Sequence, residues 1–89
     1  MINGKTRSGF VFSVDMDSLQ DDWEYAELLG ELEDHPEKQP RVMKATLGER
    51  QYNKLKEHCR EDGKISTARM GEEIEDIFSA IGRGDSGKN

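Results

Sequence analysis

The sequence is poor in cysteine, in apolar residues and in long hydrophobic runs. Cys59 is the only cysteine, so no internal disulfide can form, and a reducing compartment suits the chain. Hydrophobic residues make up 33% of the 89 residues, and no apolar run approaches the roughly 18 to 20 residues of a membrane span. The first 18 residues also lack the apolar core of a signal peptide. We therefore expect a cytoplasmic protein with no membrane contact.

Residues 15–34 contain no lysine or arginine and carry a charge of −9. The acids of this segment are Asp15, Asp17, Asp21, Asp22, Glu24, Glu27, Glu31, Glu33 and Asp34. The rest of the chain has 13 bases and 10 acids, a balance of +3. The net charge of −6 argues against a general nucleic-acid binder, which needs a basic face. The uneven split suggests head-to-tail self-association or a basic partner, while the plainer interpretation is a solvated acidic helix face.

The pattern of apolar residues predicts a mainly α fold with an N-terminal β-hairpin, in one domain over residues 1–82. Such a small core has little stability of its own, so a homo-oligomer would supply further burial. The hairpin is expected over residues 1–14, with Gly9 providing the positive φ of a short loop. Phe10, Phe12 and Val14 alternate with polar or exposed positions, so their side chains should pack on helices.

An acidic helix is expected over residues 17–33, capped by Asp17 with Gln20. Leu19, Trp23 and Ala26 follow the helical period, and further apolar residues widen the stripe. The stripe is wider than one small core requires, so part of it is predicted to bind a partner or a second copy. The candidate partner-binding residues are Trp23, Tyr25, Leu28 and Leu32. The alternative is that the aromatic pair is simply core.

Three further helices are expected, over residues 41–47, 49–61 and 66–81. A loop with both prolines, Pro36 and Pro40, precedes them, and Gly48 separates the first two. Asp62 and Gly63 should end the second helix. The last helix is expected to begin at Ser66, to pack Ile65 on Met70, and to end at Gly82. Its apolar stripe comprises Met70, Ile74, Ile77, Phe78 and Ile81.

The C-terminal residues 82–89, GRGDSGKN, match three well-known motifs that their context does not support. A phosphate-binding loop lies between a strand and a helix, whereas these glycines follow a helix. A GDSG nucleophile needs a fixed base and acid, and an RGD adhesion ligand belongs to secreted proteins. Because residues 83–89 lack apolar side chains, we expect a disordered tail.

No catalytic or metal-binding constellation is evident. His58 and Cys59 are adjacent and point in different directions on a helix, and His35 lies in a proline loop, so they do not form a zinc site. We expect Cys59 to be a small buried hydrophobe and both histidines to be exposed. The prediction is a protein that is not an enzyme and has no cofactor.

Four segments that together span most of the chain resemble the small tail assembly chaperones of long-tailed phages and prophages of Gram-positive bacteria. They are INGKTRSGFVFSVD, DSLQDDWEYAELLGELED, TLGERQYNKLKEHCREDGKIS and EEIEDIFSAIG. The resemblance implies a non-enzymatic protein that associates with the helical tape-measure protein, helps tail-tube subunits to polymerise around it, and is absent from the mature virion. It transfers no individual site residue.

Two other functions stay open at the level of the sequence. One is a small acidic phage regulator or DNA mimic that binds a basic partner. The other is a structural neck or tail subunit, which would be found in virions. The resemblance also implies that a longer form can be made by ribosomal frameshifting. Gly87, Lys88 and Asn89 permit, but do not require, the codons GGA AAA AAC, which contain a slippery heptamer, and the alternative is a plain disordered polar end. In the longer form the tail would link to a second domain.

Overall fold

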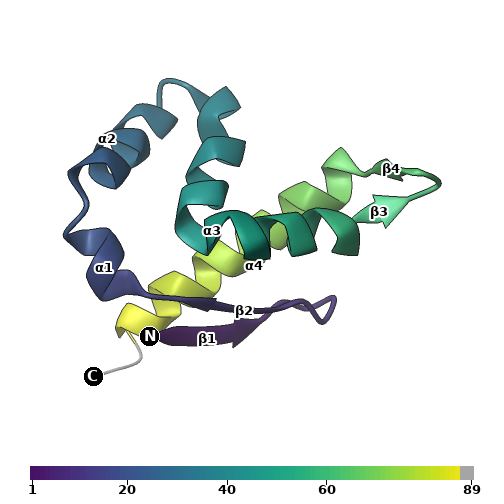
Figure 1. Cartoon of the computed structure of the whole chain (residues 1–89), viewed down its shortest axis with the longest axis horizontal. Coiled ribbons are helices and arrows are strands. Elements are labelled where there is room, and N and C mark those ends of the chain that lie inside the picture. Colours follow the sequence, from purple (N-terminus) through teal and green to yellow (C-terminus); the bar gives the residue numbers. More distant parts are fainter. Residues whose placement is uncertain (87–89) are drawn as a thin grey trace.

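The chain begins with a β-hairpin that lies along the last helix. The computed structural model describes the backbone of residues 1–86 and the side chains of residues 1–82. Strand β1 (Ile2–Lys5) pairs antiparallel with β2 (Val11–Val14), with Ile2 opposite Val14 and Lys5 opposite Val11. Figure 1 shows the hairpin beside α4 (Thr67–Ser86), and the second half of α3 (Gln39–His58) crosses α4 in the same view. The predicted class, mainly α with an N-terminal hairpin, is confirmed.

A hydrogen-bonded loop over residues 6–10 closes this hairpin. The backbone N–H of Thr6 donates to the carbonyl of Phe10 at 2.9 Å, and the N–H of Phe10 donates to the Thr6 hydroxyl at 3.0 Å. Gly9 has a φ of +100°, the left-handed value that its sequence position predicted. The loop therefore fixes the register that turns Phe12 and Val14 inward.

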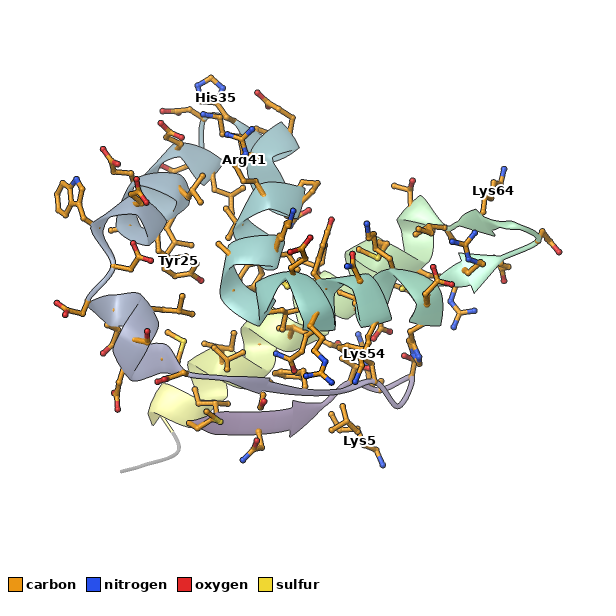
Figure 2. All side chains as sticks on the ribbon, in the orientation of Figure 1. Lys5, Tyr25, His35, Arg41, Lys54 and Lys64 are labelled. Atoms are coloured by element: carbon orange, nitrogen blue, oxygen red, sulfur yellow. The ribbon has the colours of Figure 1, made fainter. Side chains whose placement is uncertain are left out.

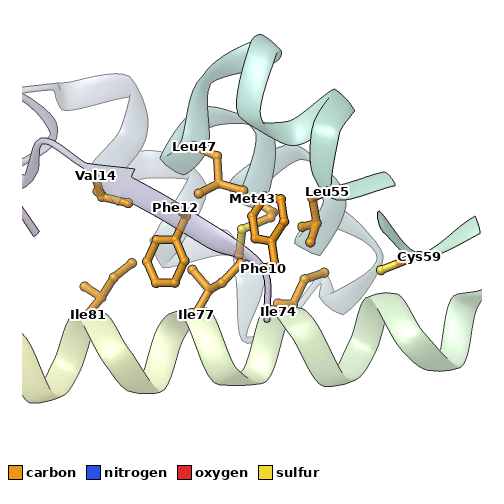
Figure 3. Packing of buried hydrophobic residues seen from close by; sticks show 10 residues of the cluster. All are labelled: Phe10, Phe12, Val14, Met43, Leu47, Leu55, Cys59, Ile74, Ile77 and Ile81. Atoms are coloured by element: carbon orange, nitrogen blue, oxygen red, sulfur yellow. The ribbon is translucent and has the colours of Figure 1, made fainter. Parts of the chain in front are cut away.

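The hydrophobic core lies between the hairpin, the bend of α3 and one face of α4. Figure 3 shows Phe10, Phe12 and Val14 between α3 and the isoleucine row of α4. Ile74, Ile77 and Ile81 form that row, as the stripe in the sequence predicted. Phe12 is 2% exposed and Ile77 is fully buried. Aromatic and branched side chains from three elements thus close the centre of the molecule.

The acidic segment folds as two helices instead of the single helix that the sequence predicted. They are α1 (Met16–Gln20) and α2 (Trp23–Leu32). The Asp22 carboxylate accepts hydrogen bonds from the N–H groups of Glu24 and Tyr25, which starts a new helix there. Asp15, not Asp17, caps α1 through the N–H of Ser18. The cap at Asp22 therefore interrupts what the apolar pattern presents as one continuous helix.

A single glycine bends α3. Gly48 has φ 84° and ψ 157°, so α3 consists of two helical parts that meet at the break expected there. The helix begins earlier than predicted, at Gln39, because Pro40 fits the first turn, where no backbone N–H is needed. The preceding proline, Pro36, starts the short 3₁₀ helix η1 (Pro36–Lys38) in the expected loop.

A second, two-residue hairpin follows α3 and was missed in the sequence. Strands β3 (Arg60–Glu61) and β4 (Lys64–Ile65) pair across Asp62 and Gly63, whose φ values are +53° and +83°. Two positive φ values suit the right-handed twist of a tight hairpin, and the Asp-Gly pair is its usual sequence. The helix predicted to reach residue 61 therefore ends at His58.

The last helix, α4, runs past its predicted end. Ser66 caps it as expected, with its hydroxyl accepting from the N–H of Arg69 at 3.2 Å. Gly82 continues the helix, which reaches Ser86 instead of ending at Gly82 as predicted. Gly82 and Gly84 each cost a helix only about 1 kcal/mol, and neither ends it. Residues 87–89, on which the frameshift prediction rests, lie outside the described residues. Within residues 1–86 no helix combines the length and apolar character needed to cross a membrane.

Candidate protein-binding site

The two acidic helices form an arm on one side of the molecule, and we call residues 15–34 the acidic arm. Figure 1 places α1 and α2 at the end opposite the β3–β4 hairpin. The arm is held to α3 by a buried hydrogen bond of 2.7 Å between the hydroxyls of Tyr25 and Thr46. The Thr46 hydroxyl donates its one proton to the carbonyl of Val42, so Tyr25 is the donor in this pair. Tyr25 thus anchors the arm to the first half of α3.

Trp23 opens α2 and is the largest apolar side chain that the arm exposes. Its exposed fraction is 76%, although tryptophan is usually well covered in a folded domain. It lies at the edge of a shallow acidic depression. The other lining residues are Asp15, Asp17, Ser18, Asp21, Asp22 and Glu24. The arm therefore presents one aromatic side chain surrounded by carboxylates.

The structure separates the four residues predicted to bind a partner. Trp23 is exposed, whereas Tyr25 is 6% exposed and points toward α3 (Figure 2). Leu28 and Leu32 are half-buried on the same side of α2 as Tyr25. The helical period explains this, because residues 25, 28 and 32 fall on one face of α2, whereas Trp23 lies about 200° around the helix from Tyr25. Of the four, Trp23 alone is largely available to a partner.

All nine acids of the arm are exposed to solvent. Lys38 reaches Glu31 at 2.7 Å, and its hydrogen bond lowers the pKa of that carboxyl below its usual value. Within the described part of the chain, no other acid of the arm makes a salt bridge. The arm therefore keeps most of its negative charge available for an interaction with another molecule.

A polar cluster that the sequence did not predict joins the hairpin loop to α3 and α4. The Ser8 hydroxyl donates to Glu73 Oε2 at 2.5 Å and lies 2.8 Å from His58 Nε2. Beside it, the Arg7 guanidinium and backbone N–H both contact the Asp76 carboxylate, which raises the pKa of Arg7. Residues about 50 and 65 positions apart meet here, so no local signal could have indicated the cluster.

The cluster contains a serine, a histidine and a glutamate, but their hydrogen-bond order does not suit nucleophilic catalysis. Ser8 gives its proton to Glu73, so His58 Nε2 must donate to Ser8 instead of accepting from it. Phe10 also packs its ring 5.5 Å from that of His58. His58 is half-buried, not exposed as predicted, because the hairpin loop folds over it. The cluster fastens the loop to the helices.

Cys59 and His35 lie apart, one buried and the other on the surface. Cys59 is fully buried, and burial raises the pKa of its thiol, so it stays protonated near neutral pH. His35 is exposed beside Glu37 at 3.2 Å. Among the described residues, no group of three or more metal-ligating side chains comes together. Cys59 is thus the small buried hydrophobe that the sequence predicted.

An apolar groove lies between α3 and the start of α4 and has a volume of about 280 Å³. Its lining consists of Gln39, Pro40, Tyr52, Lys56, Ile65, Thr67, Met70, Gly71 and Ile74. Ile65 and Met70, predicted to pack together around the cap of α4, both contribute. Lys56 is the single charged residue of this lining, and its Nζ lies 5.2 Å from the centre of the Tyr52 ring. The groove thus pairs apolar walls with one positive charge.

The resemblance to tail assembly chaperones rests on the order of segments along the sequence. Comparisons with known proteins add no relative that would identify the arm or the groove. No protein-family model, no curated protein and no solved structure matches the chain.

Proposed function

We propose that this protein is a non-enzymatic tail assembly chaperone of a long-tailed phage or prophage. In this proposal it binds the tape-measure protein through the acidic arm and holds it ready for the tail-tube protein. It acts in the host cytoplasm and leaves before the virion matures. The resemblance along the sequence motivates the choice of client.

The observation that carries the proposal is the 76% exposure of Trp23 within an arm of nine exposed acids. An exposed tryptophan is a strong contact for an apolar helix surface, because it buries a large area at low entropic cost. The surrounding carboxylates stay hydrated and keep such a complex soluble. Together they suit a protein that covers the apolar face of a long helical client.

Co-expression with the tape-measure protein of the same gene cluster tests the proposal. Wild type should be recovered with tagged tape-measure protein, and Trp23→Ser should reduce recovery at least about tenfold, as expected for loss of a central aromatic contact. Val11→Ser is the matched control, because Val11 is also an exposed apolar residue, at 69%, but lies on β2. Equal recovery of wild type and Trp23→Ser would contradict the proposal. So would a gene that does not lie between the major tail protein and tape-measure genes.

A second candidate, an acidic regulator or DNA mimic, is favoured by the exposure of all nine acids of the arm. It would bind a basic partner mainly by charge, so binding should disappear as salt rises and be insensitive to Trp23→Ser. Client capture through Trp23 should survive moderate salt, since its apolar contact is not screened. A salt series with both forms of the protein separates the two functions.

A further inference from the structure

We propose that the groove between α3 and α4 binds Trp23 of a second copy of this chain, so that the protein associates head to tail. The two parts of this contact lie on different surfaces of each molecule. Trp23 is on the arm, and the groove is lined by Tyr52, Lys56, Met70 and Gly71 among others. This inference concerns the protein alone and stands whether or not the tape-measure protein is its client.

The size of the groove favours a single side chain as its occupant. At about 280 Å³ it lies just below the range of roughly 300 to 1,000 Å³ typical of small-molecule sites. Protein interfaces often place one aromatic anchor in a pocket of this kind. Trp23 is the only tryptophan in the chain, and at 76% exposed it is left largely uncovered by its own molecule.

Charge selects the acidic arm as the partner for this groove. Lys56 at the groove has no acid beside it in the lining, while Trp23 lies between Asp22 and Glu24. The helix that carries Lys56, α3, has five lysine and arginine residues against two glutamates. By contrast, the two hollows near the first hairpin have no net positive lining, because Lys5 and Arg7 are offset there by acids. These acids are Glu72, Glu73, Glu75 and Asp76. Opposite charges thus direct Trp23 to the apolar groove.

The contact is heterologous, because a copy that gives its arm still has an empty groove. Each such contact allows a further copy to be added. The result is a closed ring if the geometry closes, and an open chain of copies if it does not. An interface built on one aromatic anchor is small, so association should depend strongly on concentration and weaken with salt. Since the same Trp23 serves the proposed client, client binding and self-association would compete.

Intrinsic fluorescence and sedimentation of the purified protein test this directly, because Trp23 is the only tryptophan. From about 10 µM to about 1 mM, a range that covers weak complexes, emission should move to shorter wavelength while the mean mass rises. Gly71→Gln should abolish both changes by filling the groove. No neighbouring atom lies within 4 Å of a Cβ built at Gly71, so the variant should fold. Ser79→Gln, at an exposed position on the same helix, is the matched control.

Mixing variants distinguishes this contact from a symmetric one. Trp23→Ala keeps its groove and Gly71→Gln keeps its tryptophan, so each alone should be monomeric and their mixture should form pairs that grow no further. Lys56→Glu should weaken association at least tenfold, and Lys54→Glu, exposed and outside the groove, should change it less than twofold. A monomeric wild type across the whole range would overturn the proposal. A mixture that stays monomeric, or association that survives Trp23→Ala, would overturn it too.

Discussion

The acidic arm and the body formed by the first hairpin, α3 and α4 differ in the exposure of one aromatic side chain each, since Tyr25 of the arm is buried like the aromatics of the body. Phe12 in the body is 2% exposed, whereas Trp23 in the arm is 76% exposed. Body side chains meet from three elements, while the arm is attached mainly along the inner face of α2. Burial of Phe12 stabilises the fold of the body, whereas Trp23 in the arm is left available for another molecule.

The largest loss of stability should follow removal of an aromatic residue from the body. Phe12→Ala leaves a cavity between β2 and the isoleucine row of α4, which should cost roughly 3 to 5 kcal/mol in unfolding free energy. Chemical denaturation followed by circular dichroism measures this. Val11→Thr on the same strand is exposed and should change stability by less than about 0.5 kcal/mol. Near-wild-type stability of Phe12→Ala would place the hairpin outside the core.

A smaller loss of stability should follow from adding a side chain at Gly4, beneath the ring of Phe12. Gly4 lies opposite Phe12 in the hairpin, and a Cβ built there would lie 2.6 Å from the ring atom Cζ. Alanine normally stabilises a strand relative to glycine, but here the buried ring has little room to move. Gly4→Ala should therefore destabilise by about 1 to 3 kcal/mol, the usual cost of overpacking. Asn3→Ala, exposed on the same strand, is the control, and a stabilised Gly4→Ala would contradict the packing.

Weakening the attachment of the arm to α3 should reduce the unfolding free energy by less than Phe12→Ala or Gly4→Ala. Tyr25→Phe removes the hydroxyl that donates to Thr46, and a single buried hydrogen bond contributes about 1 kcal/mol. Thr46 keeps its own bond to the carbonyl of Val42, so no donor is left unsatisfied. Hydrogen exchange should show the N–H groups of α2 opening more readily while those of α4 stay unchanged. Tyr52→Phe provides a comparison at a half-buried tyrosine, and equal protection of α2 in wild type and Tyr25→Phe would argue against this anchor.

Local signals in the sequence predicted the body better than the arm. The alternation of Phe10, Phe12 and Val14, the isoleucine spacing of α4 and the cap at Ser66 each depend on a few neighbouring residues, and the structure contains all three. The Asp-Gly turn of the second hairpin is an equally local signal. Asp62 and Gly63 were interpreted from the sequence only as the end of a helix, whereas they form the turn between β3 and β4. A recognised turn sequence would have revealed β3 and β4.

The arm required information that its own sequence does not hold. Asp15, Asp17, Asp21 and Asp22 all suit a helix cap, and tertiary packing of Tyr25 on Thr46 favours the break at Asp22. That packing decides which side of α2 faces α3, and so whether Trp23 is buried or exposed. Of the four residues predicted to bind a partner, Trp23 is exposed and the other three lie on the inner face, so partner binding by Trp23 stays a prediction. The groove likewise combines residues from both halves of α3 and from α4.

The smallest expected effect on stability is at the residue on which both proposals depend. Trp23→Ala removes a side chain that is 76% exposed, so the unfolding free energy should change by less than about 0.5 kcal/mol at low protein concentration. At high concentration the wild type should become more stable than the variant, because association stabilises only the folded state. Thermal unfolding at two concentrations, with Phe12→Ala beside it, therefore separates the roles of the two aromatics. Phe12→Ala should lose the same stability at both concentrations. A Trp23→Ala variant that is strongly destabilised when dilute would mean that Trp23 belongs to the core, and that the arm offers no aromatic side chain to another molecule.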